Sequence, residues 1–256
     1  MSLVAGRKDF ELPPAALQNA LVFLAVPDHA VAATAARLAR RHGAGGWSAV
    51  HVSGALGLGV LDPLRPRPVG SFHPLQSFPV PRDPSAFAGI MVAVDASTTA
   101  LVRRLARLAR DLGAKPRRVD DSQRVLYHAA AVFASNFVDV TVAEAIRVLK
   151  QIGWGEADAL VALMPLVEGA ASNIRRKGPT AALTGPIRRG DASTVESHLA
   201  ALRRLGGRPR IDDVYRMLGL VALEIAKEAG LDPAAAGRTK RALTRKAAAT
   251  RRRGRS

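Results

Sequence analysis

The sequence predicts an α/β domain with a parallel, doubly wound sheet, followed by an all-helical domain. In residues 1–120, short β-type runs alternate with helical ones, which is the pattern of a parallel sheet. From Asp121 onward the β-type runs disappear and only helical periodicity remains. The chain has 256 residues, 48% of them hydrophobic, so it can build the cores of two modest domains. We place the first domain at 1–120 and the helical domain at 121–237.

The predicted strands of the first half are short apolar runs. Leu21–Val26 is apolar throughout and stops at Pro27, as expected for a strand buried on both faces. The other predicted strands are Ser2–Gly6, Ala49–Ser53, Val69–Phe72 and Ile90–Val94. Amphipathic helices are predicted over 30–42 and 98–112, and the second of these has leucines on one side and arginines on the other.

Four helices are predicted for the second half, over residues 122–152, 156–176, 194–205 and 211–229. His128, Val132 and Asn136 lie four residues apart, so they share one face of the first of these helices. Ser135 and Asn136 are poor helix formers for a mid-helix position. Their face therefore either meets a ligand or makes a hydrogen bond to another helix.

The formal net charge of +17 is concentrated at the C-terminus. Residues 238–256 hold nine basic and no acidic residues, which leaves a net charge of +8 for residues 1–237. We predict a basic tail over 238–256 that packs little against the rest, because alanine and arginine dominate it and no apolar stripe is present. Such a tail either contacts nucleic acid weakly through counterion release or is a solvated extension without a specific partner.

The composition excludes several classes of site. No cysteine is present, which excludes disulfides, thiolate metal sites and cysteine nucleophiles. No group of His, Asp and Glu has the spacing of metal ligands, so no metal is expected. The apolar runs are shorter than the roughly 18 residues of a membrane span, and the N-terminus does not read as a secretory signal. These features predict a cytoplasmic protein that does not enter a membrane.

Ser53 and His73 are the candidate catalytic residues. Ser53 and Gly54 end one predicted strand, and His73 with Pro74 ends the next. The ends of neighbouring parallel strands meet at the carboxyl edge of the sheet, where open α/β folds bind ligands. A hydroxyl group there can orient an imidazole, which can act as an acid or a base near neutral pH. The alternative is that His73 only caps the loop backbone beside Pro74.

One further segment is a candidate ligand site, and one glycine-rich stretch is not. Gly185–Asp191 joins two predicted helices and either holds an anionic substrate through its two cations, Arg188 and Arg189, or forms a helix N-cap with Asp191. The glycines of Gly54–Gly59 run in the reverse order of the dinucleotide fingerprint, so we do not interpret this stretch as a phosphate loop.

Five segments together resemble one family: Leu24–Asp28 (LAVPD), His51–Gly57 (HVSGALG), Ser71–Phe78 (SFHPLQSF), Tyr127–Asn136 (YHAAAVFASN) and Ala182–Asp191 (ALTGPIRRGD). It is the bacterial family that joins a Rossmann-like domain to a domain of unknown function, DUF2520. This family is similar to pyrroline-5-carboxylate reductase, prephenate dehydrogenase and the deazaflavin-dependent NADP oxidoreductases. The resemblance implies an N-terminal NAD(P)-binding domain and a C-terminal helical domain like that of 6-phosphogluconate dehydrogenase, through which such proteins usually dimerise.

The resemblance to prephenate dehydrogenase implies roles for individual residues. Those enzymes carry a Ser after one strand and a His-Pro pair after the next; the Ser orients the His, which takes a hydroxyl proton from the substrate. Ser53 and His73 match that order. The related hydroxyacid dehydrogenases use a K-x-x-x-N pair, and if Asn136 is that Asn, Val132 replaces the lysine, which favours His73. The residues implied for the substrate pocket are His128, Asn136, Arg189 and Asp191.

One departure from the family pattern concerns the cofactor. The superfamily begins with a strand, a G-x-G-x-x-G motif and a helix that binds the pyrophosphate. No such motif precedes Leu21. Leu3–Arg7 resembles the second strand of the fold, with Arg7 where a cation would meet the 2′-phosphate of NADP. The other residues implied to flank the cofactor are Val26, Pro27, Asp28 and Gly54. We therefore expect an incomplete Rossmann-like sheet that binds NAD or NADP weakly or not at all, either because the start codon lies too far downstream or because the anchor has been lost.

The resulting prediction is an NAD(P)-dependent oxidoreductase-like protein for a small carboxylated substrate, with a homodimer formed through the helical domain. The alternative is a non-enzymatic binding or scaffolding relative whose basic tail contacts nucleic acid. The pair Ser53 and His73 favours the first prediction, and the missing glycine motif favours the second.

Overall fold

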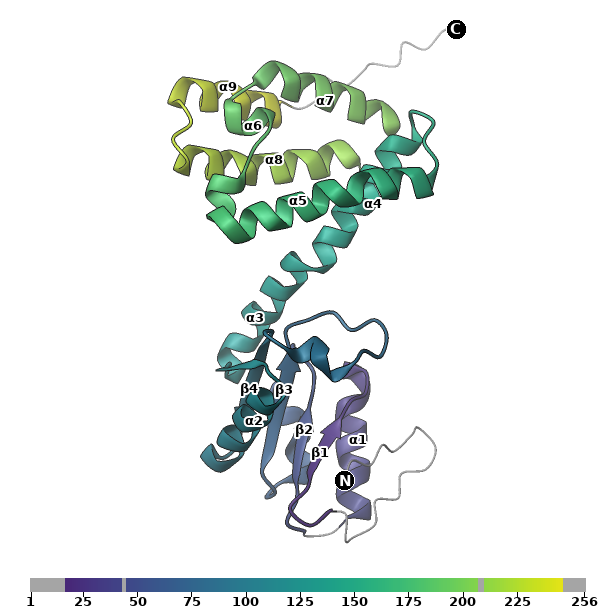
Figure 1. Ribbon diagram of the computed structural model, residues 1–256, viewed down its shortest axis with the longest axis vertical. Coiled ribbons are helices and arrows are strands. Elements are labelled where there is room, and N and C mark those ends of the chain that lie inside the picture. The colour runs from purple at the N-terminus through teal and green to yellow at the C-terminus, as the bar shows by residue number, and fades with distance from the viewer. Residues whose placement is uncertain (1–16, 43–44, 207–209, 246–256) are drawn as a thin grey trace, which may run out of the picture. The chain divides into compact units, whose positions relative to one another are not determined.

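The computed structural model describes residues 17–42, 45–206 and 210–245. The chain divides into two compact units, Met1–Val138 and Asp139–Ser256. Figure 1 shows strands in the first unit and, over the described residues, helices alone in the second. Three predictions lie outside the described residues: the strand Ser2–Gly6, the role of Arg7, and the tail beyond Arg245.

Within the described residues, the first unit holds a five-stranded sheet in the order β1-β2-β3-β4-β5. Its strands are β1 (Leu21–Leu24), β2 (Ser48–His51), β3 (Val69–Pro74), β4 (Met91–Ala96) and β5 (Lys115–Arg118). β1, β2 and β3 are parallel, as predicted, and β4 and β5 are parallel to each other. The α/β class is therefore confirmed, and β5 is a strand that the sequence prediction did not include.

The prediction of an entirely parallel sheet is wrong at β4, which runs antiparallel to β3. A parallel neighbour needs a crossover connection, usually a helix. Between β3 and β4 the chain forms only the short 3-10 helix η3 (Pro84–Phe87). Residues 75–90 bring the chain back alongside β3, and the backbone N–H of Leu75 donates to the carbonyl oxygen of Met91.

Helices cover both faces of the sheet. α1 (Asp28–Arg41) and the 3-10 helix η2 (Leu58–Leu64) form one core with Ala49 and Val69. α2 (Thr99–Asp111) packs on the other face. As the spacing predicted, Leu101 and Leu105 of α2 are buried while its arginines are exposed. Figure 1 shows α1 and α2 on opposite sides of the strands. Alternate residues of β2 and β3 therefore face either the α1 side or the α2 side.

The predicted single helix over 122–152 is two helices, α3 (Asp121–Ala134) and α4 (Asn136–Lys150). Ser135 breaks the helix, because its φ of −125° and ψ of −77° are not helical. His128 and Asn136 therefore belong to different helices and do not share one helical face. The low helix propensity of Ser135 and Asn136 reflects this break. α3 also belongs to the first compact unit, so the unit boundary lies at Val138 rather than near residue 120.

The second unit continues with helices α5 (Glu156–Ala182), α6 (Pro186–Arg189), α7 (Ala192–Leu205), α8 (Ile211–Glu228) and α9 (Pro233–Thr244). Its buried core lies among α7, α8 and α9 and includes Val195, Leu199, Leu223 and Leu243. α6 is a single turn between two glycines of positive φ, Gly185 and Gly190. A side chain at Gly190 would also meet the Cβ of Ala235 at 2.6 Å, so glycine is required there.

The predicted start of a loosely packed tail at Arg238 is wrong for residues 238–245. α9 continues to Thr244, and its residues Thr239, Ala242 and Leu243 are buried. Asp232 caps the helix by accepting from the N–H of Ala235, and Pro233 occupies its first turn. Small alanines let α9 approach α7 and α8 closely, so the helix packs without the row of large apolar residues that the prediction required.

Helix faces in both units carry apolar residues that the described chain does not cover. By length and composition alone, Asp121–Lys150 and Glu156–Arg189 could each cross a membrane, and few of their residues are buried. The sequence prediction considered only uninterrupted apolar runs and did not register these faces. Exposed apolar faces of this kind require something to cover them.

Candidate functional site

The candidate site lies where β1, β2 and β3 end together. The parallel register aligns Leu24 with His51, and His51 with Ser71. His51 shares a sheet face with Ala49, and Ser71 and His73 share it with Val69, because side chains alternate along a strand. Polar side chains from α1 and α3 join them at this edge. We call this group the edge cluster; its members are Asp28, His51, Ser53, Ser71, His73, Asp121, Arg124, Tyr127 and His128.

Ser53 holds the loop that follows β2. Its hydroxyl donates to Oδ2 of Asp28, the first residue of α1, at 2.8 Å. The hydroxyl oxygen of Ser53 also accepts from the N–H groups of Ala55 and Leu56. No hydrogen bond joins Ser53 to His73 among the described residues. The prediction that Ser53 orients His73 is therefore wrong for this structure. The serine proton is directed to Asp28, and Ser53 shapes the backbone around Gly54.

His73 is held instead by a tyrosine of α3. The hydroxyl oxygen of Tyr127 lies 2.7 Å from Nδ1 of His73, and the two rings meet edge to face. The ring of His128 lies on another side of His73, with centroids 6.4 Å apart. Gly54 closes the group: a Cβ there would lie 2.7 Å from Nε2 of His73 and 2.8 Å from the ring of His128. The absence of a side chain at Gly54 is therefore what allows the two histidines to occupy these positions.

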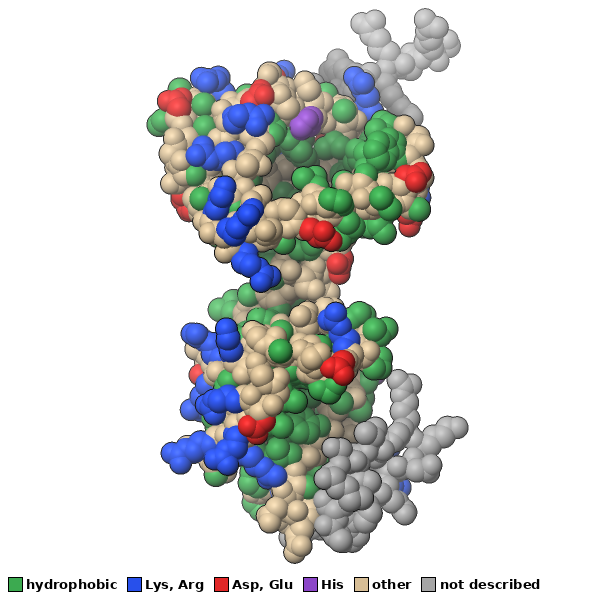
Figure 2. All heavy atoms as spheres, viewed as in Figure 1, with side chains coloured by type: hydrophobic (Ala, Val, Ile, Leu, Met, Phe, Trp, Pro, Cys, Tyr) green, Lys and Arg blue, Asp and Glu red, His purple; other side chains and the backbone are tan. Residues whose placement is uncertain are grey.

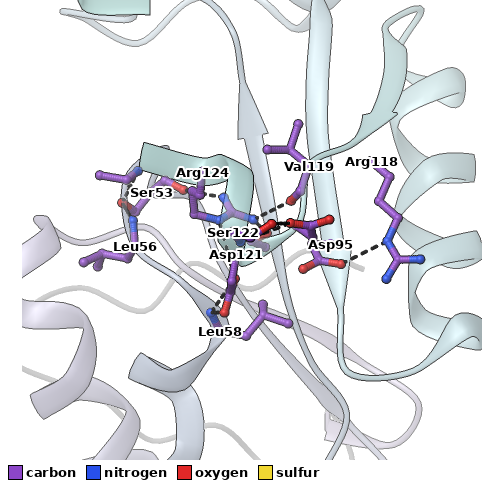
Figure 3. Close-up of polar contacts among 12 residues, drawn as sticks. Ser53, Leu56, Leu58, Asp95, Arg118, Val119, Asp121, Ser122 and Arg124 are labelled. Carbon is purple, nitrogen blue, oxygen red and sulfur yellow. Dashed lines mark hydrogen bonds and ion pairs between the residues drawn. The ribbon is translucent and has the colours of Figure 1, made fainter. Parts of the chain in front are cut away.

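Arg124 connects α3 to the sheet (Figure 3). Its side chain is 1% exposed, and its guanidinium donates to Oγ of Ser71 at 2.5 Å and to the carbonyl oxygen of Val119 at 3.2 Å. A longer contact of 3.5 Å reaches the carbonyl oxygen of Ser53. This buried cation thus links β3, the loop after β2 and the segment that leads into α3.

Asp121 fixes the second half of the loop after β2. Its carboxylate accepts from the N–H of Leu58, at the start of η2, at 3.0 Å (Figure 3). It also lies 3.8 Å from Nε of Arg124. A Cβ at Gly57 would lie 2.8 Å from the Asp121 carboxylate, so glycine permits this close approach. The first turn of α3 therefore positions both the loop and Arg124.

The environment keeps His73 neutral. Burial, the largest cause, acts together with charge repulsion from His128 and then Arg124 to lower the pKa of His73 to about 4, whereas Asp28 opposes them. Burial also raises the pKa of the Tyr127 hydroxyl to about 12, so this group keeps its proton. At pH 7 the pair therefore consists of a neutral imidazole and a neutral phenol.

His51 lies deepest in the cluster. It is fully buried, and neither ring nitrogen has a hydrogen-bond partner among the described residues. Burial, the largest cause, acts together with charge repulsion from Arg124 and His73 to lower the pKa of His51 to about 4, whereas Asp121 and Asp28 oppose them. A buried polar group without a partner is costly, and a charged one more so. His51 is therefore a neutral buried base whose protonation would oppose folding.

The remaining predicted substrate residues do not join the edge cluster in the described contacts. Asn136 is exposed at the first residue of α4. Arg189 is exposed at the end of α6, in the second unit. Asp191 caps α7: it accepts from the N–H and hydroxyl of Thr194 and from the hydroxyl of Ser193. These hydrogen bonds lower the pKa of Asp191 to about 2. The N-cap interpretation of Asp191 thus accounts for its contacts.

The described residues that were predicted to flank a cofactor, Val26, Pro27, Asp28 and Gly54, lie at the same edge as the cluster. Val26 is half-buried against the core of the α1 face, and Pro27 is exposed at the N-cap of α1. Asp28 and Gly54 are tied to the cluster as described. These residues fit the reacting end of a nicotinamide cofactor, because ligands bind at this edge in open α/β sheets. They do not fit its pyrophosphate: the sequence has no G-x-G-x-x-G motif, and α1 begins with the Asp28 carboxylate.

Sequence reasoning missed five members of the edge cluster: His51, Ser71, Asp121, Arg124 and Tyr127. Asp121, Arg124, Tyr127 and His128 recur at spacings of three and four residues, which places them along one side of a helix. That spacing was available in the sequence, but the prediction began its polar face at His128. The burial of Arg124 could not be foreseen, since arginine is almost never fully buried unless paired.

Two family models match the chain. One, described as a Rossmann-like domain, matches residues 7–74. The other, described as a domain of unknown function (DUF2520), matches residues 90–222. No protein with a curated description matches the sequence.

Several solved structures are similar over most of the chain. A Bacteroides fragilis protein, named as a candidate NADP oxidoreductase, is 26% identical with a TM-score of 0.67, over 82% of this chain and 78% of its own. A Thermotoga maritima protein is 24% identical with a TM-score of 0.69, over 83% and 79%. A 1-pyrroline-5-carboxylate reductase of Streptococcus pyogenes is 14% identical with a TM-score of 0.51, over 82% and 75%. The fold is therefore that of NAD(P)-binding oxidoreductases.

Proposed function

We propose, from the premise that this chain belongs to the DUF2520 family with its Rossmann-like domain, that it is a nicotinamide-dependent oxidoreductase acting on a small carboxylated substrate. The observation that carries the proposal is the placement of His73 at the carboxyl end of β3, where Tyr127, His128 and Gly54 surround it. An imidazole fixed at this edge can exchange a hydrogen bond or a proton with a substrate oxygen.

The residues of the edge cluster have distinct proposed roles. His73 and His128 touch the substrate, and Gly54 leaves room beside them. Ser53 and Asp28 hold the loop after β2, and Arg124 holds that loop against β3. When bound, the nicotinamide cofactor would supply or accept hydride. Asn136 remains a proposed contact for the substrate carboxylate, and Arg189 remains a proposed cation for an anionic ligand of the second unit.

We expect the 256-residue chain to bind NADPH weakly, with a Kd of about 1 mM or higher. The reason is that the phosphate anchor of the fold, a glycine motif at a helix N-terminus, has no counterpart in the sequence. Titration of NADPH, followed by its fluorescence and by calorimetry, measures this. Micromolar binding would show that another segment replaces the anchor. No binding at any accessible concentration would contradict the proposed activity and favour a non-enzymatic binding protein.

We also propose that a second copy of the chain covers the apolar surface of the helical unit. Large exposed hydrophobic side chains gather on α4, α5 and α8 and in the α4–α5 connection: Val140, Ile152, Trp154, Leu160, Val161, Met164, Leu166, Ile174, Met217, Leu218 and Val221. Beside them α4, α7 and α8 enclose an apolar hollow of about 400 Å³. Figure 2 shows hydrophobic side chains around a hollow in this unit. An apolar surface of this extent on a soluble chain indicates an interface.

The double variant Val161→Glu, Leu166→Glu tests the homodimer. Both side chains are at least 70% exposed, so glutamate should not disturb the monomer but should separate two copies. Light scattering should report a dimer for the native chain and a monomer for the variant. Val80→Glu, an exposed apolar residue of the first unit, is the control and should leave the dimer intact. A native monomer that binds lipid vesicles would instead show that membrane covers the surface.

A further inference from the structure

We propose that Tyr127 is the positioning residue of His73 and fixes it as the tautomer that carries its proton on Nε2. His73 then presents a hydrogen-bond donor, not a free lone pair, to an acceptor atom such as a carbonyl or carboxylate oxygen of the substrate. This inference rests on the proposed function, in which the edge cluster receives that substrate.

The direction of the hydrogen bond follows from the partners of the tyrosine hydroxyl. Tyr127 is half-buried on α3, and among the described residues Nδ1 of His73 is the acceptor within reach of its hydroxyl, at 2.7 Å. A phenol that keeps its proton donates it where an acceptor lies in reach. Nδ1 of His73 then accepts, and a neutral imidazole that accepts at Nδ1 must carry its own proton on Nε2.

The neutral state of the imidazole follows from its surroundings. The ring of His73 is partly buried at the end of β3. The buried guanidinium of Arg124 is a nearby positive charge that disfavours a protonated imidazole. Asp28 is the acid that would favour a cation there, but its carboxylate already accepts from Ser53. Burial lowers the pKa of His73 to about 4, which agrees with a neutral ring at pH 7. A neutral imidazole that donates to a carbonyl oxygen can polarise it without a full proton transfer.

The position of Nε2 suits such a donor. It faces Gly54, where any side chain would approach it to 2.7 Å, and His128 lies beside it. Tyr127 holds the opposite nitrogen, Nδ1, so the ring cannot turn over without losing this hydrogen bond. The serine expected to orient the ring is occupied by Asp28. Tyr127 therefore determines which nitrogen meets the substrate and in which protonation state.

The second unit contains a matched pair for comparison. Nδ1 of His198 lies 3.0 Å from the hydroxyl of Tyr215, and these rings also meet edge to face. His198 is exposed on α7 and takes no part in the edge cluster. Removing the Tyr215 hydroxyl should therefore change the tautomer of His198 alone, and removing the Tyr127 hydroxyl should change the tautomer of His73 alone.

The test is the ¹⁵N spectrum of histidine ring nitrogens in the full chain without cofactor, at pH 7. For the native chain we expect His73 to show a protonated Nε2 and an unprotonated Nδ1. Tyr127→Phe should convert His73 to a mixture of both tautomers, while Tyr215→Phe should leave its signals in place. Backbone amide spectra of both variants would confirm that they remain folded.

Two results would overturn the inference: a native His73 protonated on Nδ1, or His73 signals that do not change in a folded Tyr127→Phe variant. If Tyr127→Phe fails to fold, the native spectrum alone decides, because it reports the tautomer directly. The measurement contains no nicotinamide, so its failure is separate from failure of the proposed function, which the NADPH titration tests.

Discussion

Replacement of Arg124 by methionine is expected to lower the free energy of unfolding by about 3 kcal/mol, the largest loss we foresee for one substitution in the cluster. The guanidinium is 1% exposed and donates to Ser71 and to the carbonyl of Val119. Methionine fills the space but leaves these acceptors buried without a donor. Urea denaturation at pH 7, compared between native chain and variant, gives the loss directly.

Arg124→Lys and Arg107→Met are the controls for this prediction. Lysine keeps the charge, but one ammonium group cannot reproduce the fork that reaches several acceptors, so it should recover only part of the loss. Arg107 is exposed on α2, and its replacement by methionine should change the free energy of unfolding by less than about 0.5 kcal/mol. If Arg124→Met proved as stable as the native chain, Arg124 would not be what holds α3 to the sheet.

Acidification should destabilise the protein through His51. Burial lowers the pKa of His51 from an ordinary 6.5 to about 4. Between these two values the unfolded chain binds a proton at His51 and the folded chain does not, so stability falls as the pH falls. The contribution is fully present above pH 6.5 and is lost toward pH 4, by up to about 3 kcal/mol. Denaturation midpoints measured at several pH values between 7 and 4.5 should show this decline.

The variant His51→Gln isolates this effect. Glutamine does not titrate, so the slope of unfolding free energy against pH should decrease by up to about 1.4 kcal/mol per pH unit near pH 5.5. Leu105→Ala, in the core on the α2 face, is a matched destabilising control. It should lower the free energy of unfolding equally at every pH and leave the slope unchanged. If the His51→Gln variant kept the pH slope of the native chain, His51 would not be the group that titrates.

Much of the first unit could be predicted because its elements have strong local signals. The apolar run at Leu21–Leu24 and the leucine stripe of α2 place strand and helix directly. The antiparallel turn into β4 has no such signal, because it depends on how residues 75–90 connect two similar apolar strands. β5 was missed because its sequence, KPRR, carries charge and lies at an edge of the sheet.

The location of the site could be predicted from the sequence, but the hydrogen-bond partners within it could not. Strand ends locate Ser53 and His73 at one edge, since parallel strands share their polarity. Which hydroxyl meets which acceptor depends on side chains from distant elements, here Asp28 of α1 and Tyr127 of α3. The same limit applies to α9, whose burial depends on close packing of alanines rather than on large apolar residues.

The most direct test of the central claim is the effect of NADPH on the histidine ring signals of the full chain. If the edge cluster is the reacting site, millimolar NADPH should shift the ¹⁵N and ¹H signals of His73 and His128 and leave those of His198 in place. The variant Gly54→Ala, which brings a methyl group to 2.7 Å from Nε2 of His73, should abolish these shifts. Shifts confined to His198, or none at the highest NADPH concentration, would contradict the account.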